Sequence, residues 1–264
     1  MLWRALGHIA GGFWIDVGAA DPDTHSVTRV FSERGWCGVN IEPTRVLFER
    51  LAAARPREIN LNVAVAARPG QMMFYECADA TLSSLDPAIA ERNRADGRAV
   101  TERRVEVVTL ADVCRAHARG EIHFLKIDVE GAEAEVLAGA DFMTFRPWIV
   151  VIEATQPLTR VDASADWEPG LLAAGYRFAW FDGINRFYIA EERWDALSLH
   201  FRAPPNMHDD FVQHDPGDRL QAELALAQAR IELLRAENAA LQEQCTLRAQ
   251  VWRAIGLVRR QARP

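Results

Sequence analysis

The sequence predicts an α/β fold built on a doubly wound, mostly parallel sheet of seven strands that finishes in an antiparallel hairpin. Short apolar runs alternate with segments of helical periodicity, which is typical of βαβ units. The last two apolar runs are separated only by the turn DGIN, which predicts the hairpin. The first run ends in DVGAA and passes directly into a segment of helical spacing, as the first strand of such a sheet does.

Each element follows from its local pattern. The seven apolar runs predict strands at 13–17, 37–41, 59–65, 122–128, 148–153, 177–181 and 186–190. Helical spacing between them predicts helices at 25–34, 44–54, 109–118, 132–139 and 166–174. A further strand pair is predicted at 71–76 and 103–108. It flanks a polar stretch that we expect to form a loop and a helix over one rim of the sheet.

The composition is that of an ordinary globular protein, with 264 residues, 49% hydrophobic and 25% charged, and a net charge of -7. This acidic balance argues against nucleic acid as a partner, because phosphate binding needs a basic face. The four cysteines lie far apart, which favours reduced thiols over a disulfide framework or a zinc site. The N-terminal apolar run is too short for a signal peptide and no run is long enough to span a membrane, so we expect a cytoplasmic protein.

Three regions are predicted along the chain. Residues 1–191 form the main domain, 192–216 a wrapping segment or linker, and 217–264 a coiled-coil helix with a basic amphipathic tail. Between 220 and 245, apolar residues recur at alternating steps of four and three, with Asn238 at an a position, which favours a parallel homodimer. The alternative is one amphipathic helix that folds back on the body. Residues 248–264 suit an anionic membrane surface or an acidic partner, or form a solvated helix end.

The stretch FWIDVGAADPDTHSVT, residues 13–28, lies where the first strand should meet the first helix. Ligands of such sheets bind beyond the carboxyl ends of the strands. Gly18 and the alanines after it would let a ligand approach the backbone, and Thr24, His25 and Ser26 are candidates to cap the following helix. The alternative is a tight turn with an ordinary cap.

The type of ligand is narrowed by the second strand. The first turn lacks the G-x-G-x-x-G pattern, which disfavours a nicotinamide-dependent dehydrogenase. Glu42, in VNIEP, stands at the end of the second strand, where an acidic residue can hold a ribose diol. A ribose without a pyrophosphate points to S-adenosylmethionine (SAM).

The stretch HFLKIDVEGAEAEVLAGA, residues 123–140, places Lys126 and Asp128 on the same side of a strand, with Asp128 at its carboxyl end. Glu153 ends the next strand in the equivalent position. Two such carboxylates can accept a proton from a hydroxyl, orient an acceptor or hold a divalent metal ion. Alternatively, each is a helix-capping or salt-bridged acid.

The candidates for a catalytic base are Asp128, Glu153, His25 and Lys126. A neutral His25 imidazole is a competent base near pH 7. Lys126 is the only lysine in a chain that otherwise uses arginine, and lysine can give up its proton when it is desolvated.

The segments DVGAADPDTHSVT, NIEP, NVAV, SSLDP, LKIDVEGAE and VVIEA, in this order and spacing, resemble the FkbM family of SAM-dependent methyltransferases. The resemblance covers about residues 12–212. It implies a class I (Rossmann-like) methyltransferase fold, SAM as the methyl donor and O-methylation of a hydroxyl, often on a sugar or a natural product. The cofactor residues that it implies are Asp16, Gly18, Ala19 and Glu42, with Asn62 and Ala64 near the adenine.

The sequence also departs from the common family pattern DVGANxG, because Ala20 stands for the usual Asn or Asp21 for the second Gly. FDGINRFYIAEE and PPNMHDDFV are similar to the acceptor side of members from bacterial polysaccharide loci. The candidate acceptor-binding residues are therefore Asp182, Asn185, Arg186, Asn206, Asp209 and Asp210. Alternatively, these residues form turns and surface charges.

The resulting hypothesis is a SAM-dependent O-methyltransferase that acts on a sugar hydroxyl of a bacterial surface glycan or glycolipid. Residues 248–264 would dock it at the inner membrane face or on a glycosyltransferase. The alternative is a catalytically weak, methyltransferase-like scaffold that organises a glycan-biosynthesis complex through its coiled coil.

Overall fold

The computed structural model describes residues 1–209 and residue 231, and Met1–Asp209 form a compact unit. Apart from Ile231, the predicted coiled-coil helix of 217–264 lies outside the described residues. The same holds for its dimer seam at 220–245, the docking segment 248–264 and Asp210. These remain predictions.

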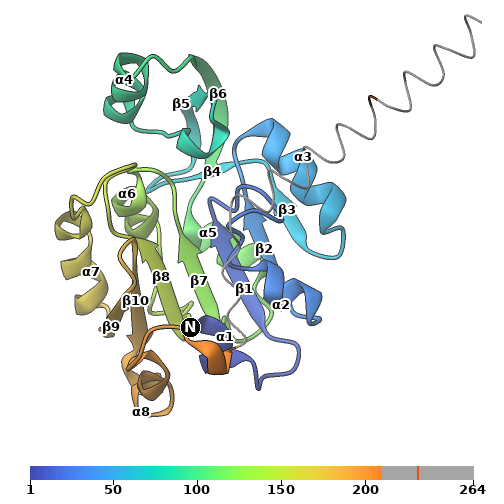
Figure 1. The fold of residues 1–264 in the computed structure, drawn as a ribbon, viewed down its shortest axis with the longest axis vertical. Helices are drawn as coiled ribbons and strands as arrows, with labels where there is room; N and C mark the ends of the chain where they lie inside the picture. The colour runs from blue at the N-terminus through green and yellow to red at the C-terminus, as the bar shows by residue number, and fades with distance from the viewer. Residues whose placement is uncertain (210–230, 232–264) are drawn as a thin grey trace, which may run out of the picture. The chain divides into compact units, whose positions relative to one another are not determined.

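A seven-stranded sheet forms the centre of this unit, in the order β3-β2-β1-β7-β8-β10-β9 (Figure 1). Neighbours from β3 to β8 are parallel, whereas β10 is antiparallel to both β8 and β9. The predicted α/β fold, its mostly parallel seven-stranded sheet and its terminal hairpin are confirmed. The strands are β1 (Phe13–Val17), β2 (Cys37–Ile41), β3 (Ile59–Leu61), β7 (Phe124–Ile127), β8 (Ile149–Glu153), β9 (Tyr176–Phe181) and β10 (Asn185–Ala190).

Helices cover both faces of the sheet because its strands are apolar on both faces. In β1, Trp14 belongs to the core on one face, while Ile15 and Val17 belong to the core on the other. The Trp14 face packs against α1 (Leu2–Leu6), α2 (Arg29–Glu33) and α8 (Trp194–Leu197). The opposite face packs against α5 (Leu110–His117), α6 (Glu133–Ala138) and α7 (Glu168–Ala173). Short 3₁₀ helices occur at Ala80–Leu82, Ser164–Asp166, Glu191–Arg193, Ser198–Phe201 and Met207–Asp209.

The predicted strand at 59–65 is wrong in its second half. After β3 the chain leaves the large sheet, and β4 (Ala64–Val65) pairs instead with β6 (Val100–Val108), which also pairs with β5 (Gly70–Cys77). The side chain of Asn62 lies at this break and donates hydrogen bonds to the carbonyls of Glu42 and Pro43. The predicted strand pair is therefore present, but in a separate three-stranded sheet.

We call residues 70–108 the cap, because they lie beyond one end of the large sheet (Figure 1). The cap contains β5, β6 and α4 (Pro87–Ala95), the helix predicted between the two strands. Asp86 caps α4 by accepting the N–H of Ala88, and Pro87 occupies the first helical position.

The predicted helix at 25–34 is too long at its start. The helix begins at Arg29, because His25 has a left-handed backbone with φ +57° that cannot continue a helical turn. Thr24, His25 and Ser26 therefore do not cap it. The remaining predicted helices, including α3 (Arg45–Ala54), begin and end within two residues of the expected positions.

No helix within the described part of the chain is both long enough and apolar enough to cross a membrane.

Close packing between neighbouring strands generates a stability prediction. A Cβ added to Gly38 in β2 would lie 2.5 Å from the indole of the fully buried Trp14. We expect Gly38→Ala to lower the free energy of unfolding by about 1–3 kcal/mol, because a packed core resists added volume. Urea denaturation measures this difference. The control is Gly120→Ala, where a Cβ would meet no atom within 4 Å. Equal losses in the two variants would contradict the packing argument.

Candidate active site

A cleft of about 640 Å³ lies at the carboxyl ends of the central strands, between the large sheet and the cap. It is lined by nine of the residues predicted from the sequence, namely Gly18, Ala19, His25, Glu42, Ala64, Lys126, Asp128, Glu153 and Asn185. The cap contributes Phe74, Thr81 and Leu82. Ligand sites of open α/β sheets occur in this position.

Lys126 links three parts of the cleft. Its Nζ donates a hydrogen bond of 2.8 Å to the carbonyl of Gly18, and it lies 3.4 Å from Asp16 and 3.3 Å from Asp128. Burial lowers the pKa of Lys126, but the charges of Asp128 and Asp16 outweigh burial and raise it above its ordinary value. Lys126 is therefore a permanent cation, which disfavours it as a base.

Asp16 does not line the cleft but lies behind it, with only 1% of its surface exposed. It is paired with Lys126 across β1 and β7 and accepts a hydrogen bond of 3.1 Å from Thr28. Burial raises the pKa of Asp16, while the Lys126 ammonium and the Thr28 hydroxyl oppose the shift. Its contribution to the cleft is indirect, through the position of Lys126.

Glu42 fastens the turn after β1 to the end of β2. One carboxylate oxygen accepts the N–H of Ala20 at 3.0 Å, and the other accepts the N–H of Thr44 at 2.7 Å. Burial raises the pKa of Glu42, and these hydrogen bonds from Thr44 and Ala20 oppose the shift. Each carboxylate oxygen retains a lone pair, so Glu42 can still accept hydroxyl groups from a ligand in the cleft.

Asn62 acts on the same loop from outside the cleft. Its amide donates to the carbonyls of Glu42 at 2.8 Å and Pro43 at 3.0 Å. Arg103 of the cap also donates to the Pro43 carbonyl, at 3.3 Å. The segment after β2 is thus held both by the body and by the cap, while Ala64 lines the cleft directly.

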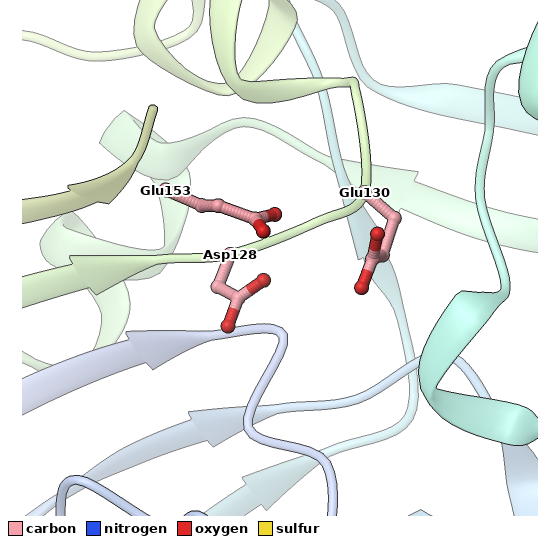
Figure 2. A group of neighbouring side chains, drawn as sticks. All are labelled: Asp128, Glu130 and Glu153. Atoms are coloured by element: carbon pink, nitrogen blue, oxygen red, sulfur yellow. The ribbon is translucent and has the colours of Figure 1, made fainter. Parts of the chain in front are cut away.

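Three carboxylates meet at the ends of β7 and β8 (Figure 2). One oxygen from each of Asp128, Glu130 and Glu153 lies within 4.8 Å of the others. Burial raises the pKa of Glu153 to about 9, and the charges of Asp128 and Glu130 add to the shift. Burial, followed by the charges of Asp128 and Glu133, raises the pKa of Glu130 to about 8. The Oε2 atoms of Glu130 and Glu153 are buried without a hydrogen-bond partner among the described residues. We call these three residues the acid cluster.

The backbone after β7 is bent to form this cluster. Glu130 is left-handed with φ +55°, and Gly131 follows with φ +95°. The Glu133 carboxylate accepts the N–H groups of Val129 and Gly131, both at 3.2 Å, and Ser84 of the cap donates to the Glu130 carbonyl at 2.6 Å. The strained conformation of Glu130 is therefore held from two sides.

The loop that carries His25 is held by a buried arginine. Arg55, 6% exposed, donates hydrogen bonds of 2.7 Å to the hydroxyls of Ser26 and Thr28 and also bonds the carbonyl of Pro22. Since Thr28 donates in turn to Asp16, the loop is connected to the centre of the sheet. His25 is exposed at the rim of the cleft.

The predicted acceptor residues divide into two groups. Asn185 lines the cleft, whereas Asp182 accepts the N–H groups of Ile184 and Asn185 in the hairpin turn. Away from the cleft lining, Arg186 is paired with Asp162 and Glu168, Asp209 is paired with Arg4, and Asn206 donates its N–H to Asp209. Apart from Asn185, the contacts of the described members are those of turn-formers and ion pairs.

Glu130, Glu133 and Arg55 shape the site and are not among the residues predicted from the sequence. Glu130 and Glu133 lie in the EGAE stretch, whose short spacing after a strand end was a usable signal. Arg55 had none, because it is one of many arginines and acts only through the tertiary contacts above.

Residues 16–178, more than half of the chain, match the family model described as the methyltransferase FkbM domain. The match contains the predicted cofactor residues and the acid cluster, and it ends before the β9–β10 turn. Comparisons with curated proteins and with solved structures gave no match.

The raised pKa of Glu153 predicts a pH-dependent stability difference. Folding raises the pKa of the Glu153 carboxyl from 4.5 to about 9, so its protonated form favours the folded state and its ionisation there lowers the stability. This contribution is complete below about pH 4.5 and is lost as the pH rises toward 9. Glu153→Gln removes this pH dependence. We therefore expect the stability of the variant, relative to that of the natural protein, to increase as the pH rises from 5 to 9.

Urea denaturation in EDTA at pH 5, 7 and 9 measures this difference. The control is Glu135→Gln, on the exposed side of α6. A stability difference for Glu153→Gln that is the same at all three pH values would contradict the burial of this carboxyl.

Proposed function

The chain belongs to the FkbM methyltransferase family, and on this premise we propose that it transfers a methyl group from SAM to a hydroxyl oxygen of an acceptor. One arrangement carries the proposal. The cleft holds Glu42, a buried carboxylate at the end of β2, and also the acid cluster at the ends of β7 and β8. The first suits a ribose diol and the second suits a hydroxyl that must lose its proton.

The residues present fit the cofactor. The cleft volume falls within the range of small-molecule sites, roughly 300–1,000 Å³. Glu42 would accept the two ribose hydroxyls, and Ala64 would border the adenine. Gly18 and Ala19 line the cleft and carry little or no side chain, so a ligand can approach closely there. When bound, SAM supplies a methyl group on a sulfonium, which an oxygen nucleophile displaces in line.

We propose that Asp128 is the base that accepts the proton of the acceptor hydroxyl. Asp128 is the member of the acid cluster that contacts the Lys126 ammonium. With a pKa of about 9, Glu153 is protonated at neutral pH, so it serves as a hydrogen-bond donor that orients the acceptor oxygen. His25 lies at the exposed rim and is kept as a second candidate base.

We propose the binding of a divalent cation as a second role for the acid cluster. Carboxylate oxygens are the ligands that Mg²⁺ prefers, and the buried Oε2 atoms of Glu130 and Glu153 have no partner among the described residues. The residues that would hold it are Asp128 and Glu153, as predicted from the sequence, together with Glu130.

The proposals for the acceptor, the cellular location and the oligomeric state rest on the sequence. We propose a sugar hydroxyl of a bacterial surface glycan or glycolipid, a cytoplasmic enzyme at the inner membrane face, and a homodimer through residues 220–245. The scaffold alternative is disfavoured because the candidate residues Gly18, Glu42, Asp128 and Glu153 are all present and line one cleft.

Binding of S-adenosylhomocysteine, the product of the cofactor, tests the proposed cofactor site. Calorimetry should detect binding to the full chain, and Glu42→Gln should weaken it roughly 10- to 100-fold, because hydrogen bonds to a charged acceptor are lost. The control is Glu49→Gln, at an exposed position on α3. A Glu42→Gln variant that binds as tightly as the natural protein would refute the ribose assignment.

Metal binding is tested on EDTA-treated protein. If the acid cluster holds a cation, Mg²⁺ should raise the thermal unfolding midpoint, because a ligand that binds only the folded state stabilises it. Glu130→Gln should reduce this increase, whereas Glu135→Gln should not. An unchanged midpoint in the presence of Mg²⁺ would refute cation binding, and proton transfer would then be the one proposed role of the acid cluster.

A further inference from the structure

Apolar side chains are exposed directly beside the mouth of the cleft. Leu158, Ile184 and Phe181 are 69%, 55% and 43% exposed. Leu158 belongs to the segment after β8, Phe181 is the last residue of β9, and Ile184 lies in the β9–β10 turn. Large apolar side chains gathered on a surface mark a binding site more often than scattered ones do.

The aromatic part of this surface is held in place. A bulge in the β9–β10 pairing puts Phe178 opposite Tyr188 and Phe181 opposite Arg186, so both rings lie on one face of the hairpin. The Arg186 guanidinium lies 5.6 Å from the centre of the Phe178 ring and 5.8 Å from that of Phe181. Its ion pairs with Asp162 and Glu168 fix this arrangement.

This surface forms a groove that continues the cleft. The groove is lined by Leu158, Thr159, Arg160, Phe181, Gly183 and Ile184. Leu158, Thr159 and Ile184 also line the cleft, so the two are continuous. Leu158 has φ +58°, a conformation that a bulky side chain rarely adopts, and strain of this kind is retained at functional positions.

The charge of the groove is opposite to that of the cleft. Arg160 is the single charged residue of the groove lining, and its guanidinium makes no ion pair or hydrogen bond within residues 1–209. The cleft, in contrast, is lined by the acidic residues Asp21 and Glu42 and by the acid cluster, with the Lys126 ammonium as its one strong cation among the lining residues. An anionic group is therefore favoured in the groove rather than in the cleft.

From this continuity and charge we propose that the groove binds the remainder of the acceptor, a hydrocarbon chain that carries a phosphate. The hydroxyl to be methylated enters the cleft, the phosphate lies beside Arg160, and the hydrocarbon covers Leu158, Phe181 and Ile184. This inference rests on the proposed methyl transfer and adds the chemical class of the acceptor, a lipid phosphate that bears a hydroxylated head group.

The probes are n-alkyl phosphates from butyl to decyl, at concentrations at which they are monomeric, titrated into the full chain saturated with S-adenosylhomocysteine. Each added methylene should tighten binding about fourfold while it is buried. Phe181→Ser should reduce this increment, and Met143→Ser, which removes a 91% exposed side chain that lines neither cavity, should not. Decyl phosphate should bind at least about tenfold more tightly than decyltrimethylammonium, and Arg160→Gln should abolish that preference.

The outcomes separate this inference from the proposed function. No binding of S-adenosylhomocysteine would overturn the methyltransferase proposal itself. Normal binding of S-adenosylhomocysteine, together with alkyl phosphate binding that depends neither on chain length nor on charge, would refute only the proposal for the groove. The groove is also refuted if Phe181→Ser leaves alkyl phosphate binding unchanged and instead lowers binding to phospholipid vesicles, or lowers the mass seen by light scattering. Those results would assign the surface to a membrane or to a second copy of the chain.

Discussion

The buried ammonium of Lys126 is the interaction on which the cleft depends. Asp16 is almost completely buried, and an unpaired carboxylate in that position would cost several kcal/mol. Lys126 compensates that charge, holds the carbonyl of Gly18 and contacts Asp128. One side chain thus couples the centre of the sheet, the turn after β1 and the edge of the acid cluster. The strand register brings the partners together, because Asp16 and Lys126 are opposite each other in β1 and β7.

The charges of the acid cluster are not balanced in this way. Its three carboxyl groups lie close together, and among the described residues the Lys126 ammonium is the one that contacts them, at Asp128. Its geometry depends on parts of the chain that are distant in sequence. Glu133 holds the turn from the body, and Ser84 holds it from the cap. The predicted cofactor residues and the acid cluster lie within the residues that match the family, whereas the hairpin turn beside the groove lies beyond them. The groove therefore spans the end of the match, with Leu158, Thr159 and Arg160 inside it and Phe181, Gly183 and Ile184 beyond it.

Much of this arrangement could be predicted because it follows from alternation along strands. The parity of Lys126 and Asp128, and the equivalent position of Glu153, place their side chains at one edge of a parallel sheet. The errors occur where tertiary contacts override local pattern. The run at 59–65 has apolar residues at all positions except Asn60 and Asn62 and reads as one strand, yet Val65 pairs with the cap. The left-handed backbone of His25 delays the following helix, and the partners of Arg55 lie at positions that no periodicity indicates.

The burial of Lys126 also determines how the protein reacts with amine-directed reagents. It is the only lysine of the chain, it is 7% exposed, and two carboxylates retain its proton. Acylating reagents need an accessible, unprotonated amine, and the ε-amino group of Lys126 meets neither condition in the folded protein. Acylation at Lys126 requires the cleft to open. The one ε-amino group of the chain therefore acts as a built-in chemical reporter of cleft opening.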